Sequence, residues 1–493
     1  MKILLSEHKI QTISLVNSLE SENTLCFTEA LFKKLNPANI SVFKTDRGQK
    51  VYPFNLKLKE NTCELTANYY VGVDWLIMGE KFVQVEPKIN SAVINAFLAN
   101  TESDESGATG NEELEDVAEK TVASAQGALE VDFLRILLDL SDNPSTAPFI
   151  SKVLKIDWDA EQIPIEQKDD RLTPFLIVQF LQVLKFIVRK GLKKSYYKVQ
   201  NNLTNRVKGK ILVGQHLKQN IFKNRITNTY CEYQEFGIDD LENRFLKKAF
   251  TFAINYVQND KTFFQQKDRR KDDSLSLKEE LLHIINYCRP AFENVSNEIK
   301  EEELKNVKFN PFFKEYKDGI KLGGYILKKF SYNISNTTKT KVTTPPFWID
   351  MPILFELYVH RKLLEDNPGL SSKIKYQFGT YGNYLDLLIC DKESPIIIDA
   401  KYKLHYQTSH IHQDIRQVAG YARLQKVRRE VGLNCKDDRN IACLIIYPTL
   451  SAGAEELSIT RLNEIISDSR SNSPFAIHAY HKVYKLGVEL PLI

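Results

Sequence analysis

Tyr384-Leu-Asp-Leu-Leu-Ile-Cys390 is a short apolar run, and Pro395-Ile-Ile-Ile-Asp-Ala-Lys401 is a second one that follows after a few turn residues. Short apolar runs rich in β-branched residues and bounded by turn residues are typical of β-strands, so this stretch predicts a β-hairpin. If residues 392–393 form a two-residue turn, Asp386 lies directly opposite Asp399, with Cβ atoms roughly 5 Å apart. A longer loop would make the two aspartates a diagonal pair.

The two aspartates and Lys401 predict a metal-dependent phosphodiesterase site. Carboxylates that close repel each other unless one is protonated or a cation lies between them, and Mg²⁺ with its oxygen ligands is the usual solution. We expect Asp386, Asp399 and the Ala400 carbonyl to bind Mg²⁺, with Mn²⁺ as a substitute. Lys401 shares a strand face with Asp399 and would orient a water or stabilise developing charge. The aspartate at the end of one strand, or the Asp-Ala-Lys of the other, would alone be an ordinary strand edge or ion pair. The combination of the two favours a catalytic site.

Helices on both sides of the hairpin add polar side chains. Glu356 lies on the helix before it, where a carboxylate could supply an outer-shell metal contact or hold a water; a mid-helix glutamate is otherwise a surface residue. On the helix after it, Asp414, Gln417 and Tyr421 share one face. Gln417 and Tyr421 are expected to contact the site or a DNA phosphate. The alternative is a polar helix face with a half-buried tyrosine.

The chain has 493 residues, of which 43% are hydrophobic and 26% charged. These values are ordinary for a soluble globular protein of about two to four domains. No apolar run approaches the roughly 18 residues of a membrane span, and the first residues lack the apolar core of a signal peptide, so we expect a cytoplasmic protein without a membrane partner. Seven cysteines without a C-x-x-C pair argue against a disulfide framework and a zinc site.

One segment of the chain is strongly basic. Between Arg171 and Cys231 there are thirteen lysines or arginines and no acidic residue. Such a block, interleaved with tyrosines, is typical of a surface that tracks nucleic-acid phosphates. The alternatives are a solvated helix face and a patch for an acidic protein partner. The candidate nucleic-acid-binding residues are Lys193, Lys194, Arg206, Lys208 and Lys210.

The order of patterns predicts an α+β protein of three parts. Residues 1–155 are β-rich and contain a flexible acidic loop at 101–120. Residues 156–340 are mostly helical and basic. Residues 341–493 hold the hairpin within an α-β-β-α-β order that fits a compact α/β nuclease core. The helices expected in the middle part are 174–188, 241–257 and 275–287; those expected in the last part are 353–364 and 412–431, with a further strand at 441–447.

The residues of the candidate site resemble the PD-(D/E)XK nuclease superfamily. This resemblance is carried by Asp386, Asp399-Ala-Lys401 with Tyr402-Lys403 behind it, Glu356 ahead of it, and Gln417 with Tyr421 after it. More narrowly, the chain is similar to the McrC family, the nuclease subunits of McrBC restriction systems. The motifs similar to that family are Phe355-Glu-Leu-Tyr, Ile398-Asp-Ala-Lys-Tyr-Lys, Asp414-Ile-Arg-Gln-Val-Ala-Gly-Tyr-Ala422, Val85-Glu-Pro-Lys-Ile89 and Leu241-Glu-Asn-Arg-Phe-Leu-Lys247. One departure is Leu385, where the family has proline; this residue only shapes the strand entry.

The resemblance implies a DNA endonuclease that depends on a partner. A separate AAA+ GTPase subunit, McrB-like and forming a hexameric ring, would recognise modified DNA and translocate. The McrC-like chain would dock on the ring through its β-rich N-terminal domain, stimulate GTP hydrolysis and cut double-stranded DNA. The chain has no G-x-x-x-x-G-K-[ST] motif, so it binds no nucleotide through a P-loop, which agrees with that division. Cutting both strands needs two active sites, so self-dimerisation through the nuclease domain is also expected.

Two other functions stay open from sequence. The first is a stand-alone PD-(D/E)XK nuclease of repair or recombination, which would cut without a partner. The second is a non-catalytic adaptor that activates a GTPase ring and keeps the nuclease core as a scaffold. The charges at Asp386, Asp399 and Lys401 argue against the adaptor, because a scaffold gains nothing from adjacent buried carboxylates.

Overall fold

The computed structural model divides into two compact units, each described here by itself. The first comprises described residues within 1–172 and 342–493, and the second those within 173–341. The described residues are 2–7, 10–15, 25–37, 40, 43–44, 50–90, 128–141, 143–260, 276–299, 313–334, 341–380, 383–391, 393–402, 408–433, 437, 439–449, 456–467, 475–477 and 480–492. The acidic segment 101–120 and Lys403 lie outside them.

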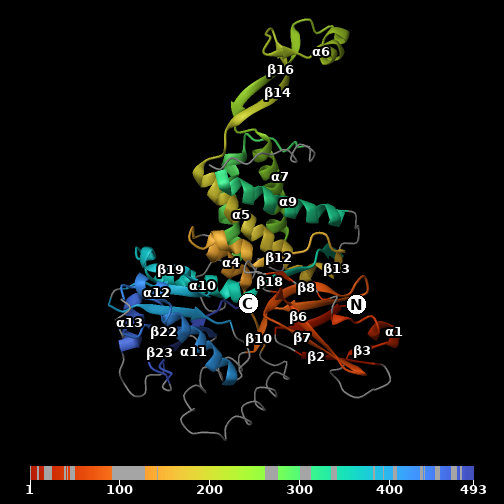
Figure 1. Cartoon of the computed structure of the whole chain (residues 1–493). Coiled ribbons are helices and arrows are strands. Elements are labelled where there is room, and N and C mark those ends of the chain that lie inside the picture. The colour runs from red at the N-terminus through yellow and green to blue at the C-terminus, as the bar shows by residue number, and fades with distance from the viewer. Residues whose placement is uncertain are drawn as a thin grey trace. The chain divides into compact units, whose positions relative to one another are not determined.

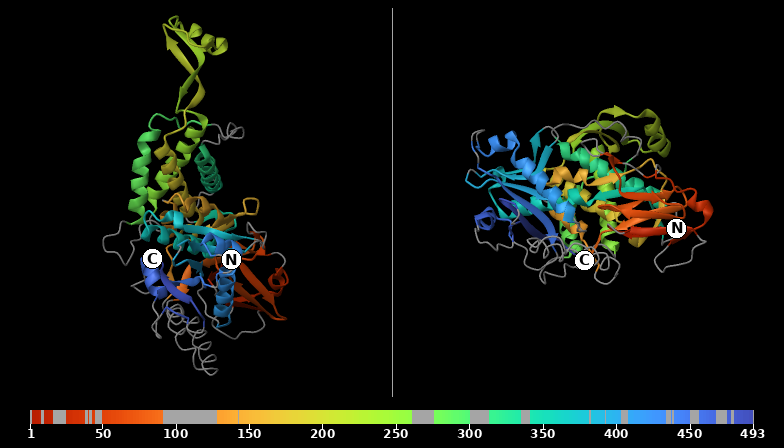
Figure 2. Two further views of the ribbon diagram at one scale, coloured as in Figure 1. Left: turned by 60° about the vertical axis from the view of Figure 1, so that its left-hand side comes forward. Right: turned by 60° about the horizontal axis from the view of Figure 1, so that its bottom comes forward.

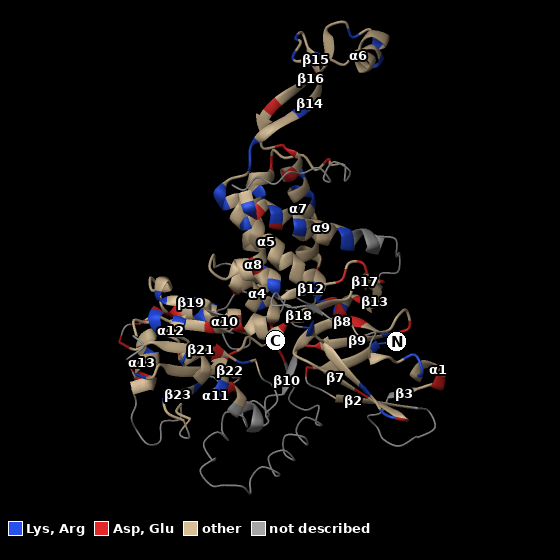
Figure 3. Ribbon diagram, viewed as in Figure 1, with Lys and Arg blue, Asp and Glu red and all other residues tan. Residues whose placement is uncertain are grey.

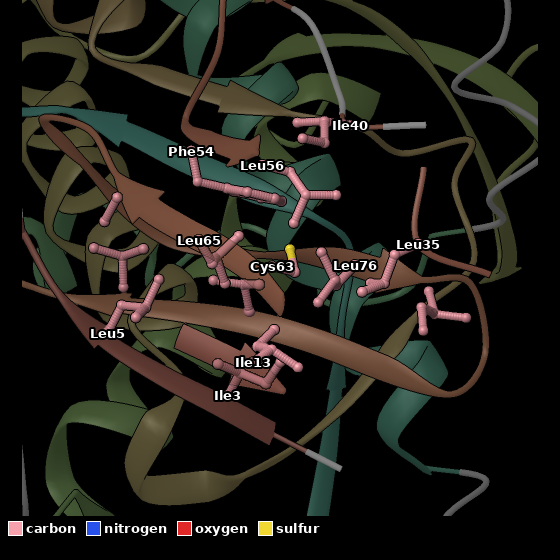
Figure 4. Packing of buried hydrophobic residues seen from close by; sticks show 14 of the residues in the cluster. Ile3, Leu5, Ile13, Leu35, Ile40, Phe54, Leu56, Cys63, Leu65 and Leu76 are labelled. Atoms are coloured by element: carbon pink, nitrogen blue, oxygen red, sulfur yellow. The ribbon is translucent and has the colours of Figure 1, made fainter. Parts of the chain in front are cut away.

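Two sheets pack together in the N-terminal part of the first unit (Figure 1). The five-stranded sheet has the order β1 (Lys2–Ser6), β9 (Lys81–Glu86), β8 (Tyr70–Ile77), β18 (Phe347–Asp350) and β12 (Leu154–Ile156). The four-stranded sheet has the order β3 (Leu25–Phe27), β2 (Ile10–Leu15), β7 (Thr62–Ala67) and β6 (Phe54–Leu58). Burial alternates along β7, as expected for a strand with one face on a core. Side chains of both sheets, among them Ile3, Ile13, Phe54 and Leu65, form one hydrophobic cluster (Figure 4).

Strand β18 joins the N-terminal sheet although it lies far along the sequence. It pairs with β8 so closely that a Cβ at Gly72 would lie 2.0 Å from the Phe347 carbonyl oxygen, which is why glycine is needed there. Trp348 is fully buried in the cluster, and its indole Nε1 donates a hydrogen bond to Asp74 at 3.2 Å. Strand β18 belongs to the part predicted to begin at residue 341. It therefore completes a sheet of the N-terminal part, which was predicted to end at residue 155.

A second five-stranded sheet lies in the C-terminal part of the first unit. Its order is β19 (Ile374–Thr380), β20 (Asn383–Ile389), β21 (Ile396–Ala400), β22 (Ala442–Thr449) and β23 (Val483–Glu489). Strand β20 is antiparallel to both of its neighbours, β19 and β21, whereas β21, β22 and β23 are mutually parallel. All residues of β21 and β22 are buried, as is usual for parallel strands covered on both faces.

Four helices accompany this sheet: α10 (Met351–Asp366), α11 (Thr408–Ala422), α12 (Gln425–Glu430) and α13 (Ile459–Ser467). Helix α10 begins where the sequence predicts, because the Asp350 side chain accepts a hydrogen bond from the Ile353 backbone N–H. The single helix predicted over 412–431 is corrected, since residues 423–424 break it into α11 and α12. The predicted α-β-β-α-β order is present, with β19 and β23 as additional strands. Together the parts form a mixed α and β protein.

The second unit holds the long helices α5 (Leu172–Lys190), α7 (Leu241–Asn259), α8 (Leu277–Cys288) and α9 (Lys314–Ile334). The three helices predicted for the middle part are all found. Helix α8 begins with a capping box between Ser276 and Glu279. Helix α5 corrects one expectation: among the described residues it is long and apolar enough to cross a membrane, with mean hydropathy 1.5. Because 72% of that window is buried within the protein, it has the character of a core helix.

Residues 195–237, which we call the arm, add strands to a middle part that the sequence predicts to be mostly helical. They form an antiparallel pair of β14 (Ser195–Thr204) and β16 (Asn228–Gly237), joined through β15 (Lys210–Ile211) and α6 (Val213–Gln219). The physical reason is the alternation of exposed and less exposed residues along β14, which has the period of a strand. In both views of Figure 2 the pair extends away from the helices of its own unit.

Candidate active site

The hairpin predicted from sequence is present, with the predicted register. Strands β20 and β21 pair Leu387 with Ile398, a register in which Asp386 comes next, opposite Asp399. The Asp386 carboxylate accepts a hydrogen bond from the Ala400 backbone N–H at 2.9 Å. Lys392, in the turn, lies outside the described residues. The two carboxylates therefore meet at the end of the hairpin away from its turn.

Asp399 faces helix α11. Ile397, two residues before it on β21, belongs to the same hydrophobic cluster as Ile415 and Val418 of α11, and residues two apart on a strand share a face. Asp399 is 0% exposed, and its Oδ2 lies 2.8 Å from the Lys401 Nζ. Neither carboxylate oxygen accepts a well-directed hydrogen bond from the residues that the structure describes. A buried carboxylate with free lone pairs is an available ligand for a cation.

Lys401 links the carboxylates to helix α11. Its Nζ donates a hydrogen bond to Gln417 Oε1 at 3.0 Å, and Gln417 Nε2 donates one to the Tyr421 hydroxyl at 2.7 Å. Burial disfavours the ammonium, but the charges of Asp399 and Asp386 outweigh it and hold the pKa of Lys401 above its usual value. The structure thus brings together Asp399, Lys401, Gln417 and Tyr421 as predicted.

The two aspartates are electrostatically unfavourable as a pair of anions. Burial, followed by the nearby charges of Glu356 and Asp399, raises the pKa of Asp386 well above its usual range. Burial also raises the pKa of Asp399, while the Lys401 ammonium opposes that shift. A divalent cation between the two would remove this conflict. The donor set of two carboxylates and the Ala400 carbonyl therefore fits a hard cation, although no group of three His, Cys, Asp or Glu that could hold a metal is found among the described residues.

Glu356 of α10 is the third carboxylate near the pair. It is only partly exposed, which sets it apart from an ordinary surface glutamate. It accepts a hydrogen bond from Gln377 Nε2 at 3.3 Å and also bonds the Tyr376 hydroxyl, and its charge acts on Asp386. Its expected role, as an outer-shell metal contact or a residue that holds a water, stays a prediction.

Gln377 was not anticipated from the sequence. It lies between the pairs Tyr376–Leu387 and Phe378–Leu385, and so opposite Asp386 on β20. Its φ is +49°, in the left-handed region that a glutamine adopts only at a cost of roughly 1–2 kcal/mol. No local signal marks such a residue, because glutamine is not a residue that favours this conformation.

We predict that Q377G is more stable than Q377A by about 1 kcal/mol, because glycine adopts positive φ freely and alanine does not. Inside a strand a glycine variant is usually less stable than an alanine variant, so the predicted order of stability is reversed at this position. Both variants also remove the amide that donates to Glu356. Urea unfolding measures the difference in stability. Equal stability of the variants would show that the backbone at 377 is unstrained.

A buried contact joins the site to the N-terminal sheets. The Tyr402 hydroxyl donates a hydrogen bond to Glu7 Oε2 at 3.1 Å, directly after β1. The Tyr402 ring packs near those of Tyr69 and Phe355, with centroids 6.1 and 5.8 Å away. Burial raises the pKa of Glu7 to about 8, and the bond from Tyr402 only partly opposes this. Glu7 is therefore mostly protonated at neutral pH.

We expect the free energy of unfolding to fall as the pH rises from 4.5 to about 8. The lower value is the usual pKa of Glu7, and the higher value is its pKa in the folded protein. Between them the folded state keeps a proton that the unfolded state has lost, so stability is full below 4.5 and lost through 8. The loss is on the order of 5 kcal/mol at most. Unfolding measured across this pH range should give a much flatter profile for E7Q. An equal slope in both proteins contradicts the assignment.

The basic candidates lie in the second unit, several of them on the arm (Figure 3). Lys193 is paired with Glu242, and its Nζ lies 3.8 Å from Asp240. Lys208 lies 3.2 Å from Glu235 and 4.0 Å over the Tyr233 ring. These two lysines are thus engaged within the protein. The exposed candidates that form no ion pair with a described residue are Lys194, Arg206 and Lys210.

The arm is also rich in exposed apolar side chains, which the sequence did not reveal. Of the seventeen large hydrophobic residues that are exposed among those described, nine lie on it. The most exposed, Ile226 at 80% and Phe222 at 76%, follow α6. The other seven are Tyr196, Val207, Ile211, Val213, Leu217, Ile221 and Phe236. A contiguous stretch with so many exposed apolar side chains marks an interaction surface.

A family model described as McrBC 5-methylcytosine restriction system component matches residues 65–432. Among solved structures, the chain is similar to one titled as a refined half-complex of Thermococcus gammatolerans McrB AAA+ hexamers with bound McrC, at 14% identity and TM-score 0.35, over 99% of this chain and 94% of that one. It is also similar to a chain of the Thermococcus gammatolerans McrBC complex, at 14% identity and TM-score 0.26, over 74% and 88%. No curated protein matches.

Proposed function

The chain belongs to the McrBC 5-methylcytosine restriction system component family, and from that premise we propose that it is the Mg²⁺-dependent DNA endonuclease subunit of a McrBC-like restriction system. The observation that carries the proposal is the buried group at the end of the hairpin: Asp386 opposite Asp399, with the Lys401 Nζ 2.8 Å from Asp399 Oδ2. We propose that the sheet β19 to β23 with α10 and α11 is a PD-(D/E)XK nuclease core.

The proposed chemistry divides between the ion and the side chains. Asp386, Asp399 and the Ala400 carbonyl would hold Mg²⁺, which when bound polarises the phosphate and acidifies a water. Lys401, whose pKa the neighbouring carboxylates raise, would stabilise negative charge on the reacting phosphate. Gln417 fixes the direction of the ammonium through its Oε1. Glu356 holds its place beside Asp386 through Gln377 and Tyr376.

Partner dependence is the second part of the proposal. One similar structure is titled as McrB AAA+ hexamers with bound McrC, and we propose that this chain likewise acts with an AAA+ GTPase ring. The contact was expected from the N-terminal 155 residues. The apolar arm is a better candidate, because it concentrates exposed hydrophobic side chains that a protein partner would bury. Cutting of both strands through paired nuclease domains, and a cytoplasmic location, complete the proposal.

The test is cleavage of methylated duplex DNA by the full chain with its partner, GTP and Mg²⁺. We expect cutting that a chelator stops and Mn²⁺ restores. Cutting by the chain alone, without nucleotide, would instead indicate a stand-alone nuclease. GTPase stimulation without any cutting would indicate an adaptor, and would overturn the nuclease assignment.

A further inference from the structure

Helix α11 presents a basic face beside the candidate active site. Its inner face is buried, with Ile415, Val418 and Tyr421 in the hydrophobic cluster against the sheet. The exposed residues on the other side are Gln413, Arg416, Gln417 and Gly420, with Arg423 directly after the helix. No acidic side chain lies in this set. Arg416 and Arg423 form no ion pair with any residue that the structure describes, whereas most arginines elsewhere in this unit are paired.

The two arginines lie nearly in line along the helix. They are seven residues apart, which is about two turns and about 10 Å of axial rise. Gln417 follows Arg416 directly, and its Oε1 accepts the hydrogen bond from Lys401 Nζ. The row of exposed residues therefore includes a residue that contacts the proposed catalytic lysine.

Gly420 lies between the arginines and is a second, independent observation. A glycine inside a helix costs about 1 kcal/mol relative to alanine. Among the described residues, a Cβ at Gly420 would meet no atom within 4 Å, so none of them requires a glycine there. A bare backbone on an exposed helix is useful where a ligand comes close to it.

We propose that this face of α11 binds the phosphate backbone of duplex DNA at the cutting site, with Arg416 and Arg423 on phosphates and Gly420 where the DNA backbone approaches closest. The proposal rests on the proposed nuclease function and names the surface that presents DNA to the site. Guanidinium groups suit this role because they bind phosphate oxygens with two parallel hydrogen bonds. Arg416 and Arg423 have no ion pair with a described residue that must break when they do so.

The first test is binding of a duplex to the full chain in a chelator, where no cutting occurs. For R416Q/R423Q we expect affinity to fall about tenfold or more at moderate salt, and the slope of log affinity against log salt to fall by about two. The matched control is R439Q/R461Q, because Arg439 is paired with Asp437 and Arg461 with Glu464. Equal losses in both double variants, or a wild-type chain that does not bind duplex DNA, would overturn the proposal.

The second test uses a pair of glycines. Gly324, in α9, is also a helical glycine whose Cβ would meet no atom within 4 Å. We expect G420A and G324A each to raise the free energy of unfolding by about 0.5–1 kcal/mol. Only G420A should also weaken DNA binding, by several-fold. If G420A binds DNA as tightly as the wild type, the DNA backbone does not approach Gly420 closely.

The outcomes separate this inference from the proposed function. If the chain binds DNA through Arg416 and Arg423 but never cuts, the DNA surface stands and the nuclease assignment fails. If it cuts and the arginine variants bind and cut normally, the nuclease assignment stands and the DNA surface fails.

Discussion

The substitution D399N is expected to lower the rate of DNA cleavage by about 10³-fold or more, while the protein stays folded. Asparagine keeps the size of aspartate but removes one of the two charges that the proposed ion needs, and metal-ion catalysis contributes several kcal/mol at about 1.4 kcal/mol per tenfold in rate. The fold should tolerate the change, because Asp399 is fully buried and its charge is opposed by burial and by the nearby charge of Asp414. Thermal unfolding is therefore expected at or above the wild-type temperature.

The measurement combines three readings: cleavage rate with Mg²⁺ and the partner, thermal unfolding, and Mn²⁺ binding. The matched control is D437N, since Asp437 is an aspartate that pairs with Arg439 at the surface of the same unit. Its cleavage rate should equal that of the wild type. D399N cutting within tenfold of the wild type would remove Asp399 from the site, and loss of cutting with loss of folding would leave only a structural role for it.

Substitution of the lysine is a weaker test for a physical reason. K401A would leave the carboxylate of Asp399 buried without its cationic neighbour, and breaking a buried pair in this way typically costs about 3–5 kcal/mol. A loss of cleavage would then mix catalysis with stability. D399N avoids this because the remaining ammonium still lies near the charge of Asp386.

The part of the site that could be predicted from sequence is the part built by local periodicity. The strands β20 and β21 are close in sequence and joined by a short turn. Counting residues outward from the turn therefore predicted that Asp386 lies opposite Asp399. Gln417 and Tyr421 followed from the spacing of a helix. In both cases the geometry depends on residues only a few positions apart.

The rest depends on contacts that no local pattern encodes. Glu7 reaches Tyr402 across 395 positions of sequence. Gln377 adopts a left-handed backbone in a strand, against the preference of its residue type. Strand β18 enters a sheet whose other members lie before residue 157. The arm was not predicted for a different reason: no local pattern shows that its aromatic and aliphatic residues are exposed.

The double variant F222D/I226D is expected to weaken binding of the AAA+ partner by about 10²-fold or more. Central apolar residues of an interface commonly contribute at least 2 kcal/mol each, and an introduced carboxylate must also be desolvated when the partner covers it. Both side chains are exposed, at 76% and 80%, so the substitutions remove no core contact and the unfolding temperature should not fall. Partner-stimulated GTP hydrolysis and co-sedimentation with the partner measure the effect.

The control M78D decides between the two docking surfaces. Met78 is 61% exposed and lies between β8 and β9, in the N-terminal part that the sequence favoured for docking. If the arm binds the ring, M78D leaves GTPase stimulation unchanged while F222D/I226D abolishes it. If M78D alone abolishes it, docking belongs to the N-terminal sheets. Since Glu7, directly after β1, accepts a hydrogen bond from the tyrosine that follows Lys401, a partner on those sheets would then lie near a residue that contacts the proposed active site.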